Sequence, residues 1–440
     1  MRILIENGII YTCEPNQPFL IGYSLLIEGD RIAWIGDGIP PLPPDLRMDA
    51  RHQVVMPGLV NAHTHTGATF LRGKFWGLSL MEWLEQSSPF LESKTFEDSQ
   101  YSSWAGVLEM AKSGITCFAD SSRTGLNIQI AAEVGLRCVA APMLVDEYPW
   151  GYQVPRAESV KEMAERLAAI TEQFRGLVSF SIGAHSPYAT LPFTLQDAKK
   201  VAQQWGVRFC LHFGEHPYEV AYVRKQYGKD LVDWLDGLKL LDSNTVGFHG
   251  NVFEEQDLNR LREIGVNLVC CPTNGALLGC PTPNLSAWGR ARIKAGLGTD
   301  GPLSSGGFNP WAELRLAGAI LGWSRFPEVT PGHLLKMATI GGASVWGLDR
   351  EIGSLKVGKK ADVITVIIPP TKYIDRATVE SMLVFGTTPR DVTNVLVDGR
   401  VIIQNGKFTS VPEKSILEDI YRYYDGIRNN LSNRRDAHEP

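Results

Sequence analysis

Two histidines, His63 and His65, have the spacing of a pair of metal ligands. They follow a short apolar segment, residues 59–62, which is predicted to form a β-strand after the break at Pro57-Gly58. Side chains two residues apart in a strand point to the same side, so both imidazoles leave the strand end in one direction. Neutral imidazole is a common ligand of zinc and iron, but an HxH pair alone is equally typical of two ordinary polar residues. Further candidate ligands elsewhere in the chain would favour a metal site over two ordinary polar residues.

Three more histidines and an aspartate also follow apolar segments that are predicted to be strands. They are His185, His212, His249 and Asp300, at the ends of residues 178–184, 207–211, 245–248 and 295–299. In an α/β barrel the catalytic groups lie at the carboxyl ends of the strands, so these side chains are expected to converge on His63 and His65. We interpret three other histidines as structural or surface residues: His52, His333 and His438.

Four of these side chains form a candidate ligand set: His63, His65, His212 and Asp300. Three imidazoles and one carboxylate leave a position for water, as catalytic metal sites do, and the metal lowers the pKa of that water to about 7. The same ligands accept zinc, iron or manganese, so the sequence does not fix the metal.

Two further residues could handle protons beside the metal. Glu215 lies three residues after His212 and can turn back to carry a proton between the activated water and a substrate. His249 can hydrogen-bond the same water. Each of these residues also has an ordinary structural explanation, such as a core histidine or a loop carboxylate. The catalytic interpretation is favoured because all of the structural explanations would have to be correct together. A zinc-protease HxxEH motif is rejected, because residues 212–216 follow a β-like segment and precede Pro217, whereas that motif needs a helix.

The segments around these residues alternate between strand-like and helix-like patterns. The predicted strands are residues 59–62, 115–120, 137–145, 178–184, 207–211, 245–248, 266–271 and 295–299. Eight strands that alternate with helices predict a (β/α)8 TIM barrel over residues 57–354. A doubly wound open sheet is the rival, but no GxGxxG follows the first strand.

Strand-rich segments flank this region on both sides. Residues 1–56 contain turn signals such as Asn7-Gly8, and residues 355–411 contain Asp398-Gly399. We predict that the two flanks form one small β-sandwich domain assembled from both chain ends. Residues 412–440 are predicted to be a C-terminal helix and a tail.

The composition excludes several classes of protein. The 440 residues carry a net charge of −5, which gives no electrostatic reason to bind nucleic acid or an anionic membrane. No apolar window approaches the roughly 20 residues of a membrane-spanning helix, and the start lacks the features of a signal peptide. The seven cysteines are an odd number, mostly in apolar segments, and are predicted to be reduced thiols. We therefore expect a cytoplasmic protein.

Several motifs around these residues resemble the amidohydrolase superfamily, in its branch of cyclic-amidine deaminases and chlorohydrolases. The matching segments are PGLVNAHTHTGATFLRG, LSLMEWLEQ, GAHSPY, LHFGE, FHG, CPTN, LGTDG and GSLKVGKKADVITV. Within the branch, the sequence is similar to S-adenosylhomocysteine/5′-methylthioadenosine deaminases. The resemblance implies one divalent metal ion, zinc foremost, and the hydrolytic release of ammonia from the exocyclic amine of an adenine-type nucleoside. It also implies a homodimer or homotetramer.

The resemblance also implies roles for individual residues. The metal ligands of the family fall on His63, His65, His212 and Asp300. Its proton-shuttling glutamate falls on Glu215 and its water-orienting histidine on His249, with the remaining proton managed by His249 and Asp300.

Substrate-binding roles in the family fall on other positions. Glu82 would bind the ribose, His185 the base or ribose, and Arg156 an amino-acid carboxylate. Trp83 could stack on a planar ring, although an aromatic residue on an amphipathic segment more often belongs to the core.

One segment departs from the pattern of these deaminases. The segment CPTNGALLGC lacks their His-Asn-Pro-x-Ser-Asn motif. The sequence therefore does not identify the part of the substrate that lies farthest from the reacting amine. Deaminases of aminofutalosine or guanine, and triazine chlorohydrolases or aminohydrolases, are the alternatives. A non-enzymatic scaffold would be expected to lack ligands, and none is missing.

Overall fold

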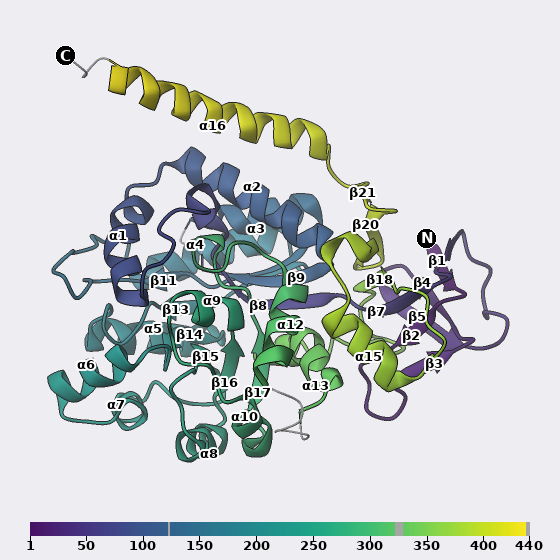
Figure 1. Cartoon of the computed structure of the whole chain (residues 1–440), viewed down its shortest axis with the longest axis horizontal. Helices are drawn as coiled ribbons and strands as arrows, with labels where there is room; N and C mark the ends of the chain where they lie inside the picture. The colour runs from purple at the N-terminus through teal and green to yellow at the C-terminus, as the bar shows by residue number, and fades with distance from the viewer. Residues whose placement is uncertain (122–123, 322–328, 437–440) are drawn as a thin grey trace.

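Parallel strands separated by helices make up the middle of the chain in the computed structural model, which describes residues 1–121, 124–321 and 329–436 (Figure 1). One sheet has the strand order β12-β10-β9-β8, and the next has the order β11-β13-β14-β15-β16-β17. The bounds are β8 (Leu59–Thr64), β9 (Ile115–Asp120), β10 (Arg137–Ala140), β11 (Met143–Leu144), β12 (Val178–Phe180), β13 (Ile182–Ala184), β14 (Phe209–Phe213), β15 (Thr245–His249), β16 (Asn267–Cys270) and β17 (Lys294–Leu297). His438 lies outside the described residues.

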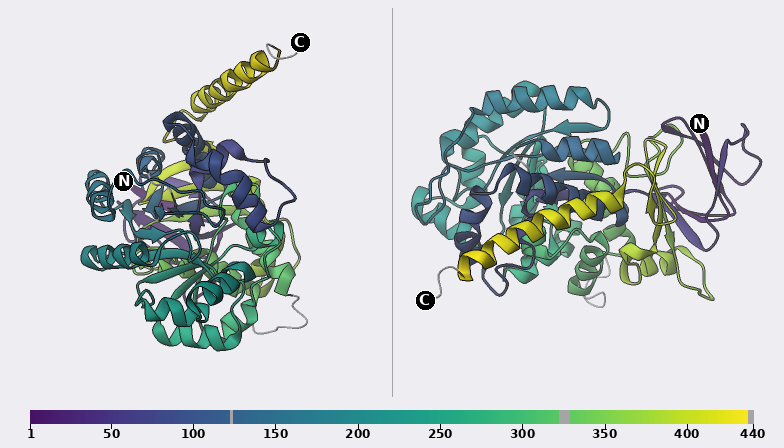
Figure 2. Two further views of the ribbon diagram at one scale, coloured as in Figure 1. Left: turned by 90° about the vertical axis from the view of Figure 1, so that its left-hand side faces the viewer. Right: turned by 90° about the horizontal axis from the view of Figure 1, so that it is seen from above.

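Helices join successive strands and cover the outer side of the sheets (Figure 2). The bounds are α1 (Leu80–Glu92), α2 (Phe96–Lys112), α3 (Leu126–Val134), α4 (Val160–Gln173), α5 (Pro192–Trp205), α6 (Pro217–Tyr227), α7 (Leu231–Gly237), α8 (Glu255–Ile264), α9 (Pro272–Leu277), α10 (Leu285–Ala291), α11 (Pro302–Ser305), α12 (Pro310–Leu321), α13 (Pro331–Lys336) and α14 (Gly342–Val345). The predicted alternation of strands and helices is confirmed, whereas closure of the sheets into one barrel stays a prediction.

Two predicted strands are each divided in two. Residues 137–145 form β10 and β11, and residues 178–184 form β12 and β13. The first division falls at Pro142, which has no N–H group to continue the ladder of hydrogen bonds. The halves then pair in different sheets, because β10 pairs with β12 and β11 pairs with β13.

Two mainly antiparallel sheets are formed by the flanking segments, and the seven-stranded one contains strands from both ends of the chain. The bounds are β1 (Arg2–Glu6), β2 (Ile9–Tyr11), β3 (Phe19–Ile21), β4 (Ser24–Glu28), β5 (Arg31–Gly36), β6 (Leu46–Asp49), β7 (Gln53–Pro57), β18 (Val363–Ile367), β19 (Val392–Val397), β20 (Arg400–Gln404) and β21 (Lys407–Phe408). The strand orders are β5-β4-β1-β6 and β21-β20-β19-β18-β7-β2-β3. β7 pairs with β18, so residues near the start of the chain are hydrogen-bonded to residues near its end.

A shared apolar core joins these two sheets. Ile3 and Leu25 of the four-stranded sheet belong to the same buried cluster as Val55, Val363 and Leu396 of the seven-stranded sheet. Alternate residues of a strand face one side, so each sheet contributes one apolar face to this core. The helix α15 (Arg376–Phe385) lies between β18 and β19 in the chain and packs on α12 and α13.

A buried ion pair links the parallel region to the second part of these sheets. Arg137 of β10 donates from Nε to Asp362 Oδ2 at 2.6 Å and from Nη2 to Asp362 Oδ1 at 3.1 Å. The same guanidinium also pairs with Asp398. Asp362 is 2% exposed, so its carboxylate accepts hydrogen bonds from Arg137 where an exposed carboxylate would accept them from water. The geometry is bidentate, the arrangement in which arginine binds a carboxylate most strongly.

We expect Arg137→Met to lower the free energy of unfolding by about 3–5 kcal/mol, because it leaves the Asp362 carboxylate buried and unpaired. Urea denaturation followed by tryptophan fluorescence measures the change. Arg31→Met is the matched control, since it breaks an ion pair with Glu351 whose side chains are 43% and 49% exposed and is expected to cost about 1 kcal/mol or less. Adding Asp362→Asn to Arg137→Met is expected to restore part of the loss; equal effects of Arg137→Met and Arg31→Met would contradict the prediction.

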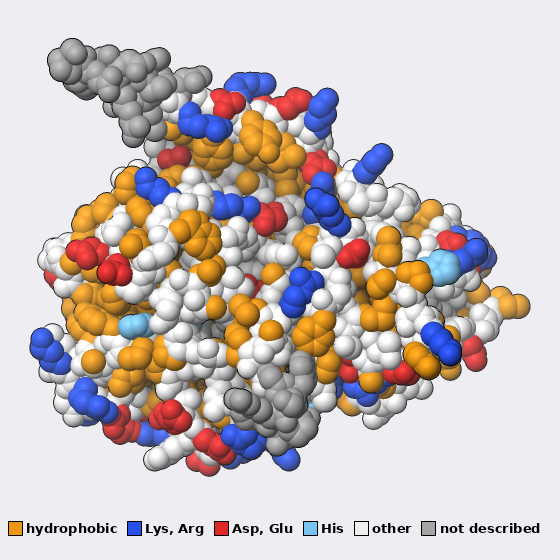
Figure 3. Space-filling model, viewed as in Figure 1, with side chains coloured by type: hydrophobic (Ala, Val, Ile, Leu, Met, Phe, Trp, Pro, Cys, Tyr) orange, Lys and Arg blue, Asp and Glu red, His pale blue; other side chains and the backbone are white. Residues whose placement is uncertain are grey.

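The last helix, α16 (Glu413–Asp436), runs along the outside of α2 (Figures 1 and 2). Tyr423 stacks on Tyr101 with ring centroids 4.6 Å apart, and its hydroxyl donates to Asp98 at 3.0 Å. On the face shown in Figure 3, basic and acidic side chains are interspersed. Among the described residues, no helix combines the length and the apolar character required to span a bilayer.

Candidate metal centre and active site

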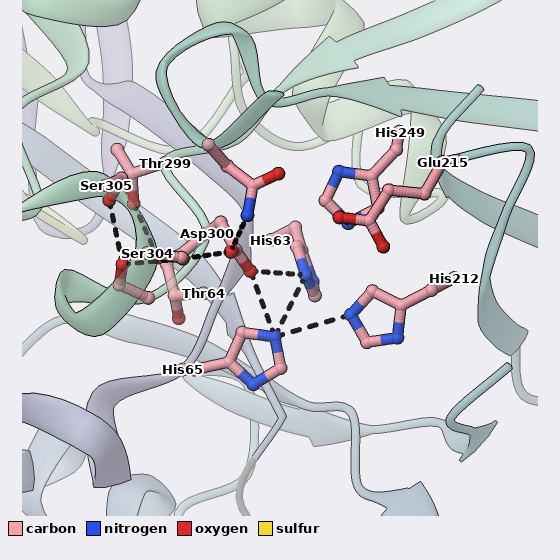
Figure 4. A network of polar contacts seen from close by, with 12 residues as sticks. His63, Thr64, His65, His212, Glu215, His249, Thr299, Asp300, Ser304 and Ser305 are labelled. Atoms are coloured by element: carbon pink, nitrogen blue, oxygen red, sulfur yellow. Dashed lines mark hydrogen bonds and ion pairs between the residues drawn. The ribbon is translucent and has the colours of Figure 1, made fainter. Parts of the chain in front are cut away.

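Strands of both parallel sheets bring the predicted ligands together at their carboxyl ends (Figure 4). His63 lies in β8 and His65 directly follows that strand, while His212 lies in β14. Asp300 follows β17, and its backbone N–H donates to the carbonyl of His63 at 3.1 Å. This bond and a parallel bridge from Thr64 to Asp300 join the start of the parallel region to its last strand.

The ligand atoms lie at the separations expected around one cation. The His63 and His65 Nε2 atoms are each 3.1 Å from Asp300 Oδ1 and 3.1 Å from one another, and the His65 and His212 Nε2 atoms are 3.4 Å apart. A tetrahedral zinc ion with ligands at about 2.0–2.1 Å places neighbouring ligand atoms about 3.3 Å apart. The four side chains therefore fit a divalent cation. A set with His249 in place of His65 is also close, with all ligand atoms within 4.8 Å of one another.

The protonation states of these groups suit metal binding. Burial lowers the pKa of His63 to about 4, and burial together with the neighbouring imidazoles holds the pKa of His212 well below its usual value. Burial alone would raise the pKa of Asp300, but His65 and His63 hold it well below its usual value. Neutral imidazoles and an ionised carboxylate at pH 7 are the forms that ligate a metal.

Hydrogen bonds to the outer atoms orient two of the ligands. His212 Nδ1 donates to the carbonyl of His185 at 2.8 Å, which leaves Nε2 free to ligate. Asp300 Oδ2 accepts from Asn274 Nδ2 at 2.5 Å and from Ser304 Oγ, so Oδ1 faces the histidines. Asp300 also has a φ of +56°, a left-handed conformation that is uncommon for a residue other than glycine and is concentrated at functional sites.

A buried carboxylate holds the turn that carries His65. Asp120, the last residue of β9, accepts from Thr66 N at 2.6 Å and from the hydroxyls of Thr64 and Thr66, both at 2.8 Å. We did not predict this residue from the sequence. The signal was present, because Asp120 is an acidic residue at the end of a predicted strand, which is the rule that found His212 and Asp300.

Glu215 and His249 lie beside the ligand group (Figure 4). His249 Nε2 is 3.6 Å from Glu215 Oε1, and Glu215 is 5% exposed. Burial and the nearby Asp300 carboxylate raise the pKa of Glu215 well above its usual value, while burial lowers that of His249 to about 3. A carboxylic acid that retains its proton near neutral pH can donate it to a substrate and take it back.

A second glutamate fixes the backbone that carries Glu215. Glu219 Oε2 accepts from the N–H groups of Gly214 at 2.8 Å and Glu215 at 3.2 Å. The Asn251 side-chain amide donates to the Glu215 carbonyl at 3.2 Å. Glu219 is 1% exposed, and burial raises its pKa to about 8. Sequence reasoning missed both Glu219 and Asn251, because their contacts depend on how the β14–α6 turn folds back.

A cavity of about 440 Å³ opens onto this group of residues. His65, His212, Glu215, His249 and Asp300 form its inner end. Its apolar and aromatic wall includes Leu80, Trp83, Leu84, Tyr148, Tyr188 and Leu303. A concave, largely apolar space with a few convergent polar groups is the usual form of a small-molecule site.

The predicted substrate-binding residues fall in different places. His185 and Trp83 line the cavity. Glu82 is exposed and is absent from the cavity wall, because its carboxylate accepts from Ser79 N at 3.0 Å and Ser79 Oγ at 2.6 Å and so caps α1. Arg156 is also exposed and outside the cavity wall, where it pairs with Asp146 at 3.2 Å. The substrate-binding roles of all four stay predictions.

Four convergent side chains that could bind a metal, beside a buried carboxyl group whose pKa is raised, are typical of metal-dependent hydrolases. Residues 54–402 match the amidohydrolase family, and the chain belongs to that family.

Similar proteins cover almost the whole chain. The 5-methylthioadenosine/S-adenosylhomocysteine deaminase of Pyrococcus furiosus is 31% identical over 425 residues, which span 94% of this chain and 98% of that protein. A protein of the same name from Thermoanaerobacter pseudethanolicus is 28% identical over 424 residues, which span 96% and 98%. The crystal structure of an adenosine deaminase from Xanthomonas campestris with bound zinc superposes with a TM-score of 0.87, at 25% identity over 97% of this chain and 98% of that one.

Proposed function

We propose that the protein is a metal-dependent hydrolase that removes the exocyclic amine of an adenine-type nucleoside and releases ammonia. The observation that carries the proposal is the convergence of four ligand atoms beside Glu215 at the inner end of one cavity. The similar deaminases, which match along nearly the full chain, support the choice of an amine on a purine ring.

The residues that would hold the metal are His63, His65, His212 and Asp300. When bound there, a divalent cation supplies a hydroxide nucleophile at neutral pH. The donor set fits zinc, and the similar adenosine deaminase from Xanthomonas campestris contains zinc, so we propose zinc as the metal.

The side chains around the cation divide the proton transfers. Glu215 donates its proton to the ring nitrogen next to the amine-bearing carbon, which makes that carbon more electrophilic. His249, neutral at pH 7, accepts a hydrogen bond from the attacking water and fixes its direction. His249 and Asp300 together carry the remaining proton from the attacking oxygen to the departing amine, which leaves as ammonia.

The cavity wall fits a flat, mostly apolar ring system. We propose that Trp83 and His185 contact the substrate, because both line the cavity beside Tyr148 and Tyr188. His185 is also tied to the metal centre through its carbonyl bond to His212. A cavity of about 440 Å³ is within the usual range for a drug-sized or nucleoside-sized ligand.

Ammonia release from adenosine, methylthioadenosine and S-adenosylhomocysteine on zinc-loaded protein tests the proposal. Turnover of at least one of them is expected, with hypoxanthine-type product seen by ultraviolet absorbance. Guanine, aminofutalosine and chlorinated triazines are run in parallel. Turnover of only guanine or a triazine would refute the nucleoside assignment while leaving the hydrolase assignment in place. Turnover of only aminofutalosine, itself an adenine nucleoside, would keep the assignment and change the substrate within it.

Glu219→Leu is expected to lower kcat about 10- to 100-fold, since the carboxylate of Glu215 loses the support that positions it and small displacements at a reacting group are costly. Glu219→Gln is the matched control: Glu219 is largely neutral below its raised pKa, and the glutamine carbonyl can accept the same two backbone N–H bonds. Initial rates at equal metal content measure both variants. Equal losses in the two variants would contradict a positioning role.

We also propose the larger-scale features that the site requires. The two parallel sheets would close into one (β/α)8 barrel over residues 57–354, supported by the Thr64–Asp300 bridge. Residues 1–56 and 355–411 would form one β-sandwich domain, supported by their common apolar core, and residues 412–440 would be an appended helix and tail. A homodimer or homotetramer is proposed from the resemblance alone, and a cytoplasmic location from the reduced cysteines.

A further inference from the structure

One buried acceptor at the inner end of the cavity is not used by the reaction scheme above. Asn274 lies in α9, is 2% exposed and is part of the cavity wall. Its Nδ2 donates to Asp300 Oδ2 at 2.5 Å. Its Oδ1 is buried, and no hydrogen-bond partner for it is found among residues 1–121, 124–321 and 329–436.

The orientation of this amide follows from its neighbour. Ionised Asp300 has only acceptor atoms, so the group 2.5 Å from it must be the NH2 of Asn274 and not its carbonyl oxygen. The carbonyl oxygen is therefore the atom left without a partner. A buried acceptor without a partner is unfavourable by roughly 1–3 kcal/mol, so native proteins seldom retain one without a ligand, a water or another use.

The position of Asn274 is fixed from two sides. The preceding residue, Thr273, donates its N–H to Glu313 Oε2 at 2.9 Å, and Glu313 is itself 2% exposed on α12. On the other side, the amide is bonded to Asp300, which Ser304 also holds. The acceptor is thus preorganised next to the carboxylate that would pass a proton to the leaving group.

We propose that Asn274 Oδ1 accepts a hydrogen bond from the amino group that the reaction removes, and that Asn274 thereby favours substrates whose leaving group carries an N–H. The inference rests on the proposed function. A leaving group of similar size without a hydrogen, such as chlorine, leaves this oxygen unpaired in the closed site. Sites built to hydrogen-bond an N–H reject analogues that lack it far more strongly than apolar pockets reject a change of size.

Two substrates that differ only at the leaving group test the inference. Adenosine and 6-chloropurine riboside share the purine and the ribose, and hydrolysis of both gives the same product. Asn274→Ala is expected to lower kcat/KM for adenosine about 10- to 100-fold more than for 6-chloropurine riboside, because only the first substrate loses a hydrogen bond.

Ser304→Ala is the matched control. It removes the other donor to the same Asp300 oxygen, so it measures how far a disturbance of Asp300 alone changes the ratio, since only the amine leaves with an added proton. The ratio is expected to change less in this variant than in Asn274→Ala. Metal content by atomic emission is measured for every variant, so that loss of the cation is separated from loss of the acceptor. Asn274→Ser replaces Asn274→Ala in the test if the alanine variant does not fold.

The outcomes are distinct. A larger change of the ratio in the Asn274 variant than in Ser304→Ala supports the inference. Equal changes in the two variants, or no change in either, overturn it and reduce Asn274 to a support for Asp300, while the proposed function stands. If adenosine is not turned over but methylthioadenosine or S-adenosylhomocysteine is, that nucleoside and its 6-chloro analogue replace the pair. If no adenine nucleoside is turned over, the proposed nucleoside function is wrong and the inference falls with it.

Discussion

Glu215→Gln is expected to lower kcat about 10³-fold while the protein keeps its metal and its fold. The amide has the shape of the acid but cannot give or take the proton that the ring nitrogen needs, and general acid–base catalysis contributes about 10²–10⁴-fold. Burial raises the pKa of the Glu215 side chain and so favours its protonated form. Initial rates with the best nucleoside substrate, together with metal analysis, measure the effect.

Glu85→Gln is the control, because Glu85 is an exposed residue of α1 and its replacement is expected to leave kcat unchanged. Retention of more than about a tenth of the wild-type kcat in Glu215→Gln would fall short even of the lower end of general acid–base effects. Glu215 would then be a support for the cavity wall and another group would carry the proton.

Loss of the metal is expected to have an effect of similar size. Dialysis against a chelator is expected to abolish turnover, and one equivalent of Zn²⁺ is expected to restore it, since no protein group replaces the hydroxide that the cation supplies. His212→Ala removes one ligand and is expected to weaken metal binding by more than about 100-fold, because even the loss of an outer hydrogen bond to a ligand costs about 10- to 100-fold. Metal equivalents after gel filtration report the change.

His216→Ala is a close control, four residues further along the chain. The His216 ring accepts a hydrogen bond from Tyr218 N and caps α6, and the residue is not in the cavity wall. Full metal content is expected in this variant. If His212→Ala also bound a full equivalent of zinc with native affinity, the four-ligand centre would be wrong.

The four candidate ligands could be predicted from the sequence because they share one position relative to the strands. His63, His65, His212 and Asp300 each come at the end of an apolar segment of strand length, and parallel strands bring such ends to one edge. The structure gives these four side chains the mutual distances reported above. The strand bounds were less predictable, since the segment 207–211 stops short of His212 itself, whereas β14 runs to Phe213.

Residues whose roles depend on the folding of loops were harder to predict. Glu82 is part of the local signature Ser-x-x-Glu, which marks a helix start, and this local bond accounts for its position in the structure. Asn274, by contrast, contacts Asp300 only because α9 folds over the loop after β17. No periodicity in the sequence reveals a contact between two loops that belong to different strands.

The pairing of β7 with β18 has a consequence for synthesis of the protein on the ribosome. β7 leads directly into the strand that carries His63 and pairs with β2, which is made earlier, yet its other partner, β18, is made only after the whole parallel region has emerged. Until then the nascent chain presents an apolar strand with an open edge, and such edges invite pairing with other chains. This topology therefore leaves one edge of β7 without its partner strand until β18 has been made.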